Sequence, residues 1–101
     1  MGARYIVARY DCENSMDDFL EKVILDLAGV LGLSQVRPSV VHAGSGGLAV
    51  IRVERSGLEI LRAALALQER DCLKIIKVAG TLRKALETLN SLSKSLSTKS
   101  I

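Results

Sequence analysis

Short apolar runs alternate with longer amphipathic segments along the chain, and this pattern predicts strands and helices in a regular order. Apolar runs rich in β-branched residues predict strands at 4–10, 48–53 and 72–78. A further strand is expected around 35–42, which contains Pro38, the only proline. Because proline has no amide hydrogen to donate, this strand should lie at the edge of a sheet or begin irregularly.

Apolar residues at helical spacing predict three helices. The first covers 16–31, with Ser15 as its N-cap and Gly32 at its end. Its apolar stripe consists of Phe19, Leu20, Val23, Ile24, Leu27, Val30 and Leu31. We expect this stripe to pack into the core. The second helix follows a Ser-Gly break at 56–57, and the third follows a Gly-Thr pair at 80–81.

The resulting order, βαββαβ followed by a C-terminal helix, is the α+β ferredoxin-like arrangement that RNA-recognition (RRM-like) modules share. Four strands then form an antiparallel sheet with both main helices on one face. If Ala49, Ile51 and Val53 face those helices, the other face of the sheet is open. We expect one domain over 1–90, followed by a serine-rich, flexible tail at 91–101.

The composition fits a single small domain. A chain of 101 residues buries enough surface to fold around one core without a disulfide or a metal ion. The formal net charge of +3 permits nucleic-acid binding but does not require it. No apolar run is long enough to span a bilayer and the N-terminus lacks an apolar leader, so we expect a cytoplasmic protein without membrane contact.

Neither the cysteines nor the single histidine predicts a catalytic or metal site. Cys12 and Cys72 lack the spacing of metal ligands, and in a reducing cytoplasm we expect them to be free thiols. A disulfide is the alternative if the source is a hyperthermophile. His42 has no candidate nucleophile or metal partner near it in the sequence. We therefore expect no catalytic residue and no metal ligand.

Three segments carry a resemblance to a known family: IRVER at 51–55, LRAALAL at 61–67 and IIKVAGT at 75–81. In wording and order they resemble archaeal ribonuclease P protein component 2, a small-subunit family shared with eukaryotic ribonuclease P and MRP. The resemblance covers about 5–83 and implies the same ferredoxin-like fold.

The resemblance also implies a function. A protein subunit of this family assists the catalytic RNA of ribonuclease P in the endonucleolytic removal of 5′ leaders from precursor tRNA. It would bind the ribonuclease P RNA and a second protein subunit, component 3, and would meet precursor tRNA only indirectly. Magnesium would serve the RNA, and this chain would bind no cofactor.

Phosphate contacts are the expected mode of RNA binding. The strand at 48–53 has no aromatic side chain on which bases could stack, so arginine and lysine should contact the backbone. The candidates are Arg4, Arg37, Arg52, Arg55, Arg62, Lys77, Arg83 and Lys84. For Arg62, an ion pair with Glu59 or Glu69 is the competing interpretation.

Apolar residues on the open sheet face and the last helix are candidates for a protein interface. They are Val50, Ile76, Val78, Leu82, Leu86 and Leu89. The leucines of the last helix either cover the sheet or dock onto a neighbour. A small-molecule-binding regulatory domain on the same fold is the alternative function, with 44–47 as its binding turn; an acylphosphatase-like enzyme lacks a suitably placed asparagine.

Overall fold

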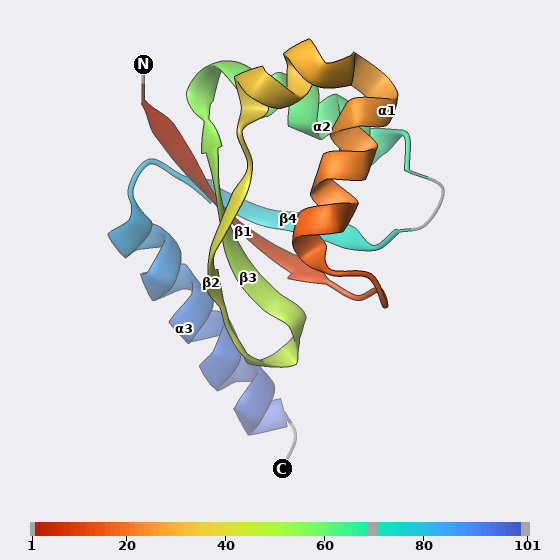
Figure 1. Ribbon diagram of the computed structural model, residues 1–101. Helices are drawn as coiled ribbons and strands as arrows, with labels where there is room; N and C mark the ends of the chain where they lie inside the picture. The colour runs from red at the N-terminus through yellow and green to blue at the C-terminus, as the bar shows by residue number, and fades with distance from the viewer. Residues whose placement is uncertain (1, 69–70, 100–101) are drawn as a thin grey trace.

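A four-stranded antiparallel sheet lies between two layers of helices (Figure 1). The structure is a computed structural model, which describes residues 2–68 and 71–99. The elements in chain order are β1 (Ala3–Tyr10), α1 (Met16–Val36), β2 (Ser39–Ala43), η1 (Ser45–Gly47), β3 (Leu48–Glu54), η2 (Arg55–Gly57), α2 (Leu58–Ala66), β4 (Leu73–Ala79) and α3 (Leu82–Lys99). The strand order is β2-β3-β1-β4, which confirms the ferredoxin-like arrangement and the edge position of the strand expected around 35–42. That strand begins at Ser39, later than predicted, because α1 continues to Val36.

The first core lies between the sheet and the pair α1 and α2. Ile6 of β1 pairs with Ile51 of β3, and both side chains are fully buried. Leu20 and Ile24 of α1 and Leu61 of α2 complete this layer. The alternation predicted for β3 is confirmed, because Ile51 and Val53 face the two helices.

The second core lies on the opposite face of the sheet, beneath α3. Val7 and Val50 pack there with Ala85 and Leu89 of α3, and all four are fully or almost fully buried. The expectation of an open sheet face is therefore wrong where α3 covers Val7 and Val50. Apolar residues recur along α3 at helical spacing, so the helix has an apolar face, and it buries this face against the sheet of its own chain.

Helix α1 differs from its predicted course at Gly29. Ser15 caps the helix as expected, because its hydroxyl accepts a hydrogen bond from the Asp18 amide at 3.2 Å. At Gly29 the backbone leaves helical geometry (φ 69°, ψ −167°), and the helix then resumes and ends at Val36. The predicted end at Gly32 is wrong. The prediction that Leu27, Val30 and Leu31 belong to the core is wrong too. Val30 and Leu31 are exposed because the break at Gly29 rotates the second half of the helix.

The third helix begins where the sequence predicts and continues further. The Thr81 hydroxyl accepts a hydrogen bond from the Lys84 amide at 3.2 Å, which satisfies one free amide of the first turn. Helix α3 extends through Lys99 and so includes most of the segment assigned to the serine-rich tail. That this segment is flexible stays a prediction, and its last residues, 100–101, lie outside the described residues.

Gly57 allows the end of α1 to pack against the start of α2. A Cβ atom at this position would lie 2.5 Å from the Val36 Cα and 2.8 Å from the Gln35 carbonyl oxygen. These neighbouring atoms belong to the backbone and cannot move aside as the end of a flexible side chain could. A side chain at position 57 would therefore force the end of α1 and the start of α2 apart.

We expect Gly57→Ala to lower the free energy of unfolding by about 3 kcal/mol. Urea unfolding followed by circular dichroism measures this loss. Gly80→Ala is the matched control, because a Cβ atom at Gly80 meets nothing within 4 Å. Equal stability of the two variants would contradict the close approach at Gly57.

Candidate nucleic-acid interface

Three cations lie together on the face of the sheet that α3 partly covers. Alternation along β1 places Arg9 on the same face as the buried Val7. Across the β1–β4 pair, Arg9 lies opposite Lys74 and Val7 lies opposite Lys77. All three cations are exposed, and we call them the β4-edge cluster. Lys74 forms an ion pair with Asp71 at 3.1 Å, which solvent weakens because both side chains are about two-thirds exposed.

Three of the predicted RNA-binding candidates share this side of the sheet with Lys77. Arg83 and Lys84 lie in the first turn of α3 and are exposed, as expected. The Arg83 Nε lies 3.5 Å from a Glu87 carboxylate oxygen, but its side chain is 90% exposed, so this pair is weak. Arg52 lies on β3, on the face that α3 partly covers. One nitrogen of its guanidinium is 3.8 Å from a Glu54 carboxylate oxygen.

The remaining candidates lie elsewhere. Arg4 is half-buried on the α1 and α2 side of β1, where its guanidinium donates a hydrogen bond to the Ala3 carbonyl. Arg55 lies in η2, and Arg37 follows the end of α1. Arg62 is exposed on α2, and no ion pair with Glu59 forms within the described residues. Glu69, its other predicted partner, lies outside them.

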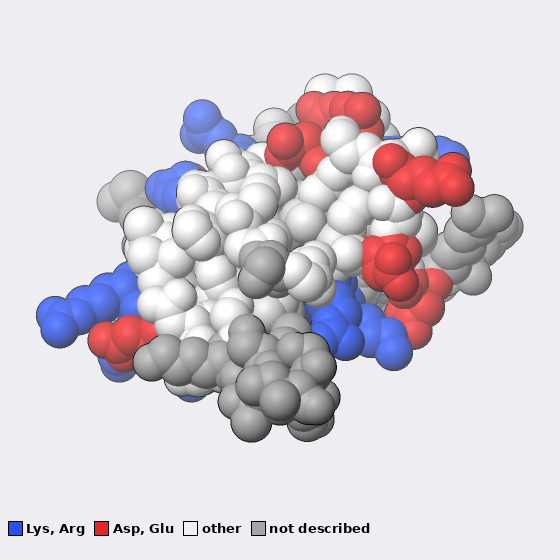
Figure 2. Space-filling model, turned by 90° about the horizontal axis from the view of Figure 1, so that it is seen from below, with Lys and Arg blue, Asp and Glu red and all other residues white. Residues whose placement is uncertain are grey.

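Charge is distributed unevenly over the molecule. Six of the eleven acidic residues fall within 11–26, a segment with Lys22 as its single basic residue. Figure 2 shows most of the acidic side chains at the right of the molecule, with basic side chains beside them and further basic side chains at the left. A polyanion is repelled from the α1 surface and attracted to the side that carries the β4-edge cluster.

Arg9 and Lys74 were not among the RNA-binding residues predicted from the sequence. Arg9 continues the alternation Tyr5, Val7, Arg9 along β1, which would have placed it on the α3 side. The register that brings Lys74 opposite Arg9 cannot be read from either strand alone, because these residues are far apart in the chain.

The two cysteines form a disulfide, so the expectation of free thiols is wrong. Cys12 follows β1 and Cys72 precedes β4, and these strands are antiparallel neighbours. Their adjoining ends therefore bring the two Cα atoms to 5.4 Å, within the range for a disulfide. The Asp11 amide also donates to the Cys72 carbonyl at 2.8 Å, which ties the same two ends together.

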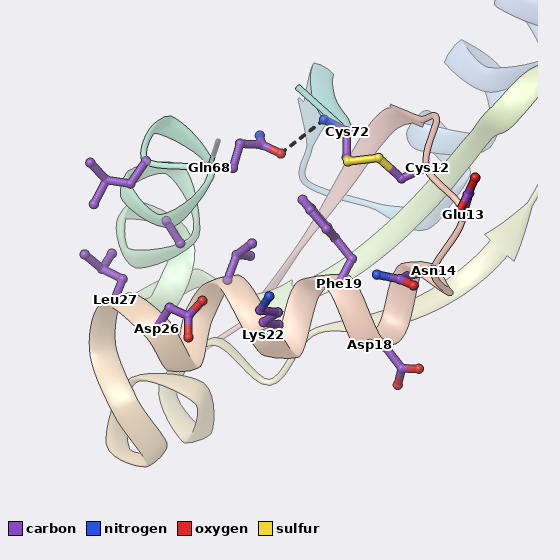
Figure 3. Close-up of a pocket in the computed structure, with 13 residues that line it drawn as sticks. Cys12, Glu13, Asn14, Asp18, Phe19, Lys22, Asp26, Leu27, Gln68 and Cys72 are labelled. Carbon is purple, nitrogen blue, oxygen red and sulfur yellow. Dashed lines mark hydrogen bonds between the residues drawn. A yellow bond between two sulfur atoms is a disulfide. The ribbon is translucent and has the colours of Figure 1, made fainter. Parts of the chain in front are cut away.

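A groove opens beside this disulfide, between α1 and α2 (Figure 3). Its volume is about 710 Å³. Tyr10 supports one end, since its hydroxyl donates to the Asn14 carbonyl and its ring lies 5.5 Å from that of Phe19. Burial raises the pKa of the Tyr10 phenol, and the negative charge of Asp18 adds to this increase.

The described residues contain no group of three or more His, Cys, Asp or Glu side chains arranged to hold a metal ion. His42 lies exposed on the edge strand β2. Within the same part of the chain, no helix combines the length and apolarity needed to cross a bilayer.

The six predicted interface residues do not form one surface. Val50 and Leu89 are fully buried in the core beneath α3, so neither is available to a partner in this conformation. Leu86 is half-buried there, and Val78 packs on the other face of the sheet. Of the six, Ile76 and Leu82 are exposed. Leu86 and Leu89 of α3 thus cover the sheet of their own chain.

The fold and the surface define a small ferredoxin-like α+β protein, with its acidic residues concentrated within 11–26 and a cluster of exposed cations on the β1–β4 pair. A family model, that of the Rpp14/Pop5 family, matches residues 4–90, which include the sheet except its first residue, Ala3, both helices of the first core and the buried residues Ala85 and Leu89 of α3. The chain belongs to this family of ribonuclease P protein subunits. A search of curated proteins finds no match.

Family membership favours the subunit over the regulatory-domain alternative. The turn at 44–47 that would bind a small molecule packs against α3, because a Cβ atom at Gly44 would lie 3.2 Å from a Leu89 methyl carbon. Helix α3 thus occupies one side of that turn.

Proposed function

We propose that the chain is a subunit of ribonuclease P that binds the RNA of the enzyme through the α3 side of its sheet and binds a partner protein elsewhere. The observation that carries this proposal is the cluster of exposed cations on the α3 side, in a member of a ribonuclease P subunit family whose acidic residues are concentrated within 11–26. An RNA-bound protein needs a cationic side, and the acidic α1 surface is left for another kind of partner.

Phosphate contacts are the mode of RNA binding that these side chains favour. The β4-edge cluster, Arg83 and Lys84 present long cationic side chains to solvent. The middle of the α3 side holds Val7 and Val50 beneath α3, so bases cannot stack on the sheet there. Such a surface recognises the shape and charge of a folded RNA and does not read its sequence.

Catalysis is assigned to the RNA, with magnesium bound by the RNA and no cofactor bound by this chain. The chain would support that RNA in removing 5′ leaders from precursor tRNA, in the cytoplasm, and would contact precursor tRNA indirectly. Its protein partner would be component 3 of the enzyme, as the family resemblance implies.

The proposal is tested by RNA binding over a salt series. We expect the affinity for ribonuclease P RNA to fall steeply as salt rises, because bound phosphates release counterions. Arg83→Gln combined with Lys84→Gln should reduce the slope of log affinity against log salt by about two. Filter binding measures both quantities, and a wild-type affinity that does not change with salt would exclude phosphate recognition.

A further inference from the structure

The groove between α1 and α2 has an apolar lining. Phe19, Val23 and Leu27 contribute from α1, and Ala64 and Leu67 contribute from α2 and its end. In Figure 3 the side chains of Phe19 and Leu27 project from α1 into the space bounded by α2 and the Cys12–Cys72 disulfide. The groove is therefore bounded by three separate parts of the fold.

Large apolar side chains remain exposed along this groove and beyond it. Leu27 and Leu67, which line it, are 41% and 69% exposed. Val30 and Leu31 follow Leu27 on the segment after the Gly29 break and are 75% and 83% exposed. Apolar side chains gathered at a groove mark an interaction surface, because their exposure to water is unfavourable.

The rim of the groove is acidic. Glu13, Asp18 and Asp26 line it, and among the described residues of its lining Lys22 is the one basic side chain. The carboxylates of Asp18 and Asp26 are exposed on α1, which belongs to the acidic side of the molecule in Figure 2. A phosphate backbone is disfavoured here, whereas lysine or arginine beside apolar side chains would be attracted.

We propose that this groove docks an amphipathic helix of a partner protein, with aliphatic side chains on one face and lysine or arginine flanking them. The aliphatic side chains would cover Leu27 and Leu67, and the flanking cations would meet Asp18 and Asp26. The inference rests on the proposed function in one respect, which is that a ribonuclease P subunit has a protein partner. The partner would then bind the acidic surface of α1, whereas the RNA would bind the cations on the α3 side.

A labelled synthetic peptide tests the docking without RNA. The probe is a helical peptide of about 14 residues with leucines at helical spacing and lysines between them. A second peptide keeps the leucines and replaces each lysine with glutamate. Fluorescence anisotropy on the full chain should show saturable binding of the lysine peptide, and the glutamate peptide should bind at least about tenfold more weakly.

Two variants locate the binding. Leu27→Ser combined with Leu67→Ser should weaken the lysine peptide at least about tenfold, because two large apolar contacts are lost. Both residues are exposed, so the fold should persist, and circular dichroism checks this. Ile76→Ser is the matched control, since Ile76 is 43% exposed on β4 outside the groove, and it should leave the affinity unchanged.

Three results would overturn the inference. They are no binding of the lysine peptide, equal binding of both peptides, and binding that the double substitution does not alter. Sedimentation of the chain alone tests whether a second copy of this chain occupies the groove. A wild-type dimer that the double substitution dissociates would assign the groove to that second copy. Because neither assay contains RNA, their failure would leave the salt-dependent RNA binding of the proposed function unaffected.

Discussion

Replacing Arg9, Lys74 and Lys77 together with glutamine is expected to weaken binding of ribonuclease P RNA on the order of 100-fold at low salt. The three side chains share one face of the β1–β4 pair, so a single RNA segment can contact all of them. Each lost phosphate contact lowers the salt dependence by about one counterion, and the triple variant should therefore reduce the slope by about three. Filter binding across a salt series gives both the affinity and the slope.

The control for this variant removes positive charge from the acidic side. Lys22→Gln eliminates the only cation within 11–26 and lies on α1. Because this surface already repels a polyanion, its RNA affinity should stay close to that of the wild type. A Lys22→Gln variant that loses as much affinity per charge as the triple variant would show that net charge, and not the β4-edge cluster, determines RNA binding.

Reduction of the Cys12–Cys72 disulfide is expected to lower the free energy of unfolding by about 4 kcal/mol. The disulfide closes a segment with a sequence separation of 60, which restricts the unfolded chain strongly. Urea unfolding of the wild type with and without reductant measures the difference.

The variant Cys12→Ser with Cys72→Ser provides the control for reduction. It should match the reduced wild type and should not respond to reductant. Native protein that reacts with a thiol reagent at both cysteines before reduction would contradict the disulfide.

Local patterns in the sequence predicted the element order and several positions within it. Period-two alternation identified the faces of β3, Ser15 was the expected N-cap, and Pro38 indicated an edge strand. Each of these features depends on residues within one turn or one strand. These features could therefore be predicted from the sequence of each segment taken by itself.

Features that join distant segments were not predictable in the same way. The disulfide depends on the adjacency of β1 and β4, which the spacing of the cysteines does not reveal. The burial of Val50 depends on α3 folding back over the sheet. The break at Gly29 exposes Val30 and Leu31, although their helical spacing is typical of a core stripe.

The candidate RNA site was predicted in part. Arg83 and Lys84 are exposed as expected, and Lys77 belongs to the β4-edge cluster. Arg4 was a poorer choice, because its side chain is half-buried and bonded to the backbone of its neighbour. Strand register determines which cations share a face, and register is a property of pairs of strands.

The most direct test of the account is cleavage of precursor tRNA by reconstituted ribonuclease P at limiting magnesium, with and without this chain. The assay contains the RNA and every other protein subunit in both arms. We expect a clear gain in cleavage rate from the chain, which disappears when the chain is omitted and is reduced by the triple variant, but not by Lys22→Gln. No gain from the chain, with all other subunits active, would contradict its role as a working subunit of the enzyme.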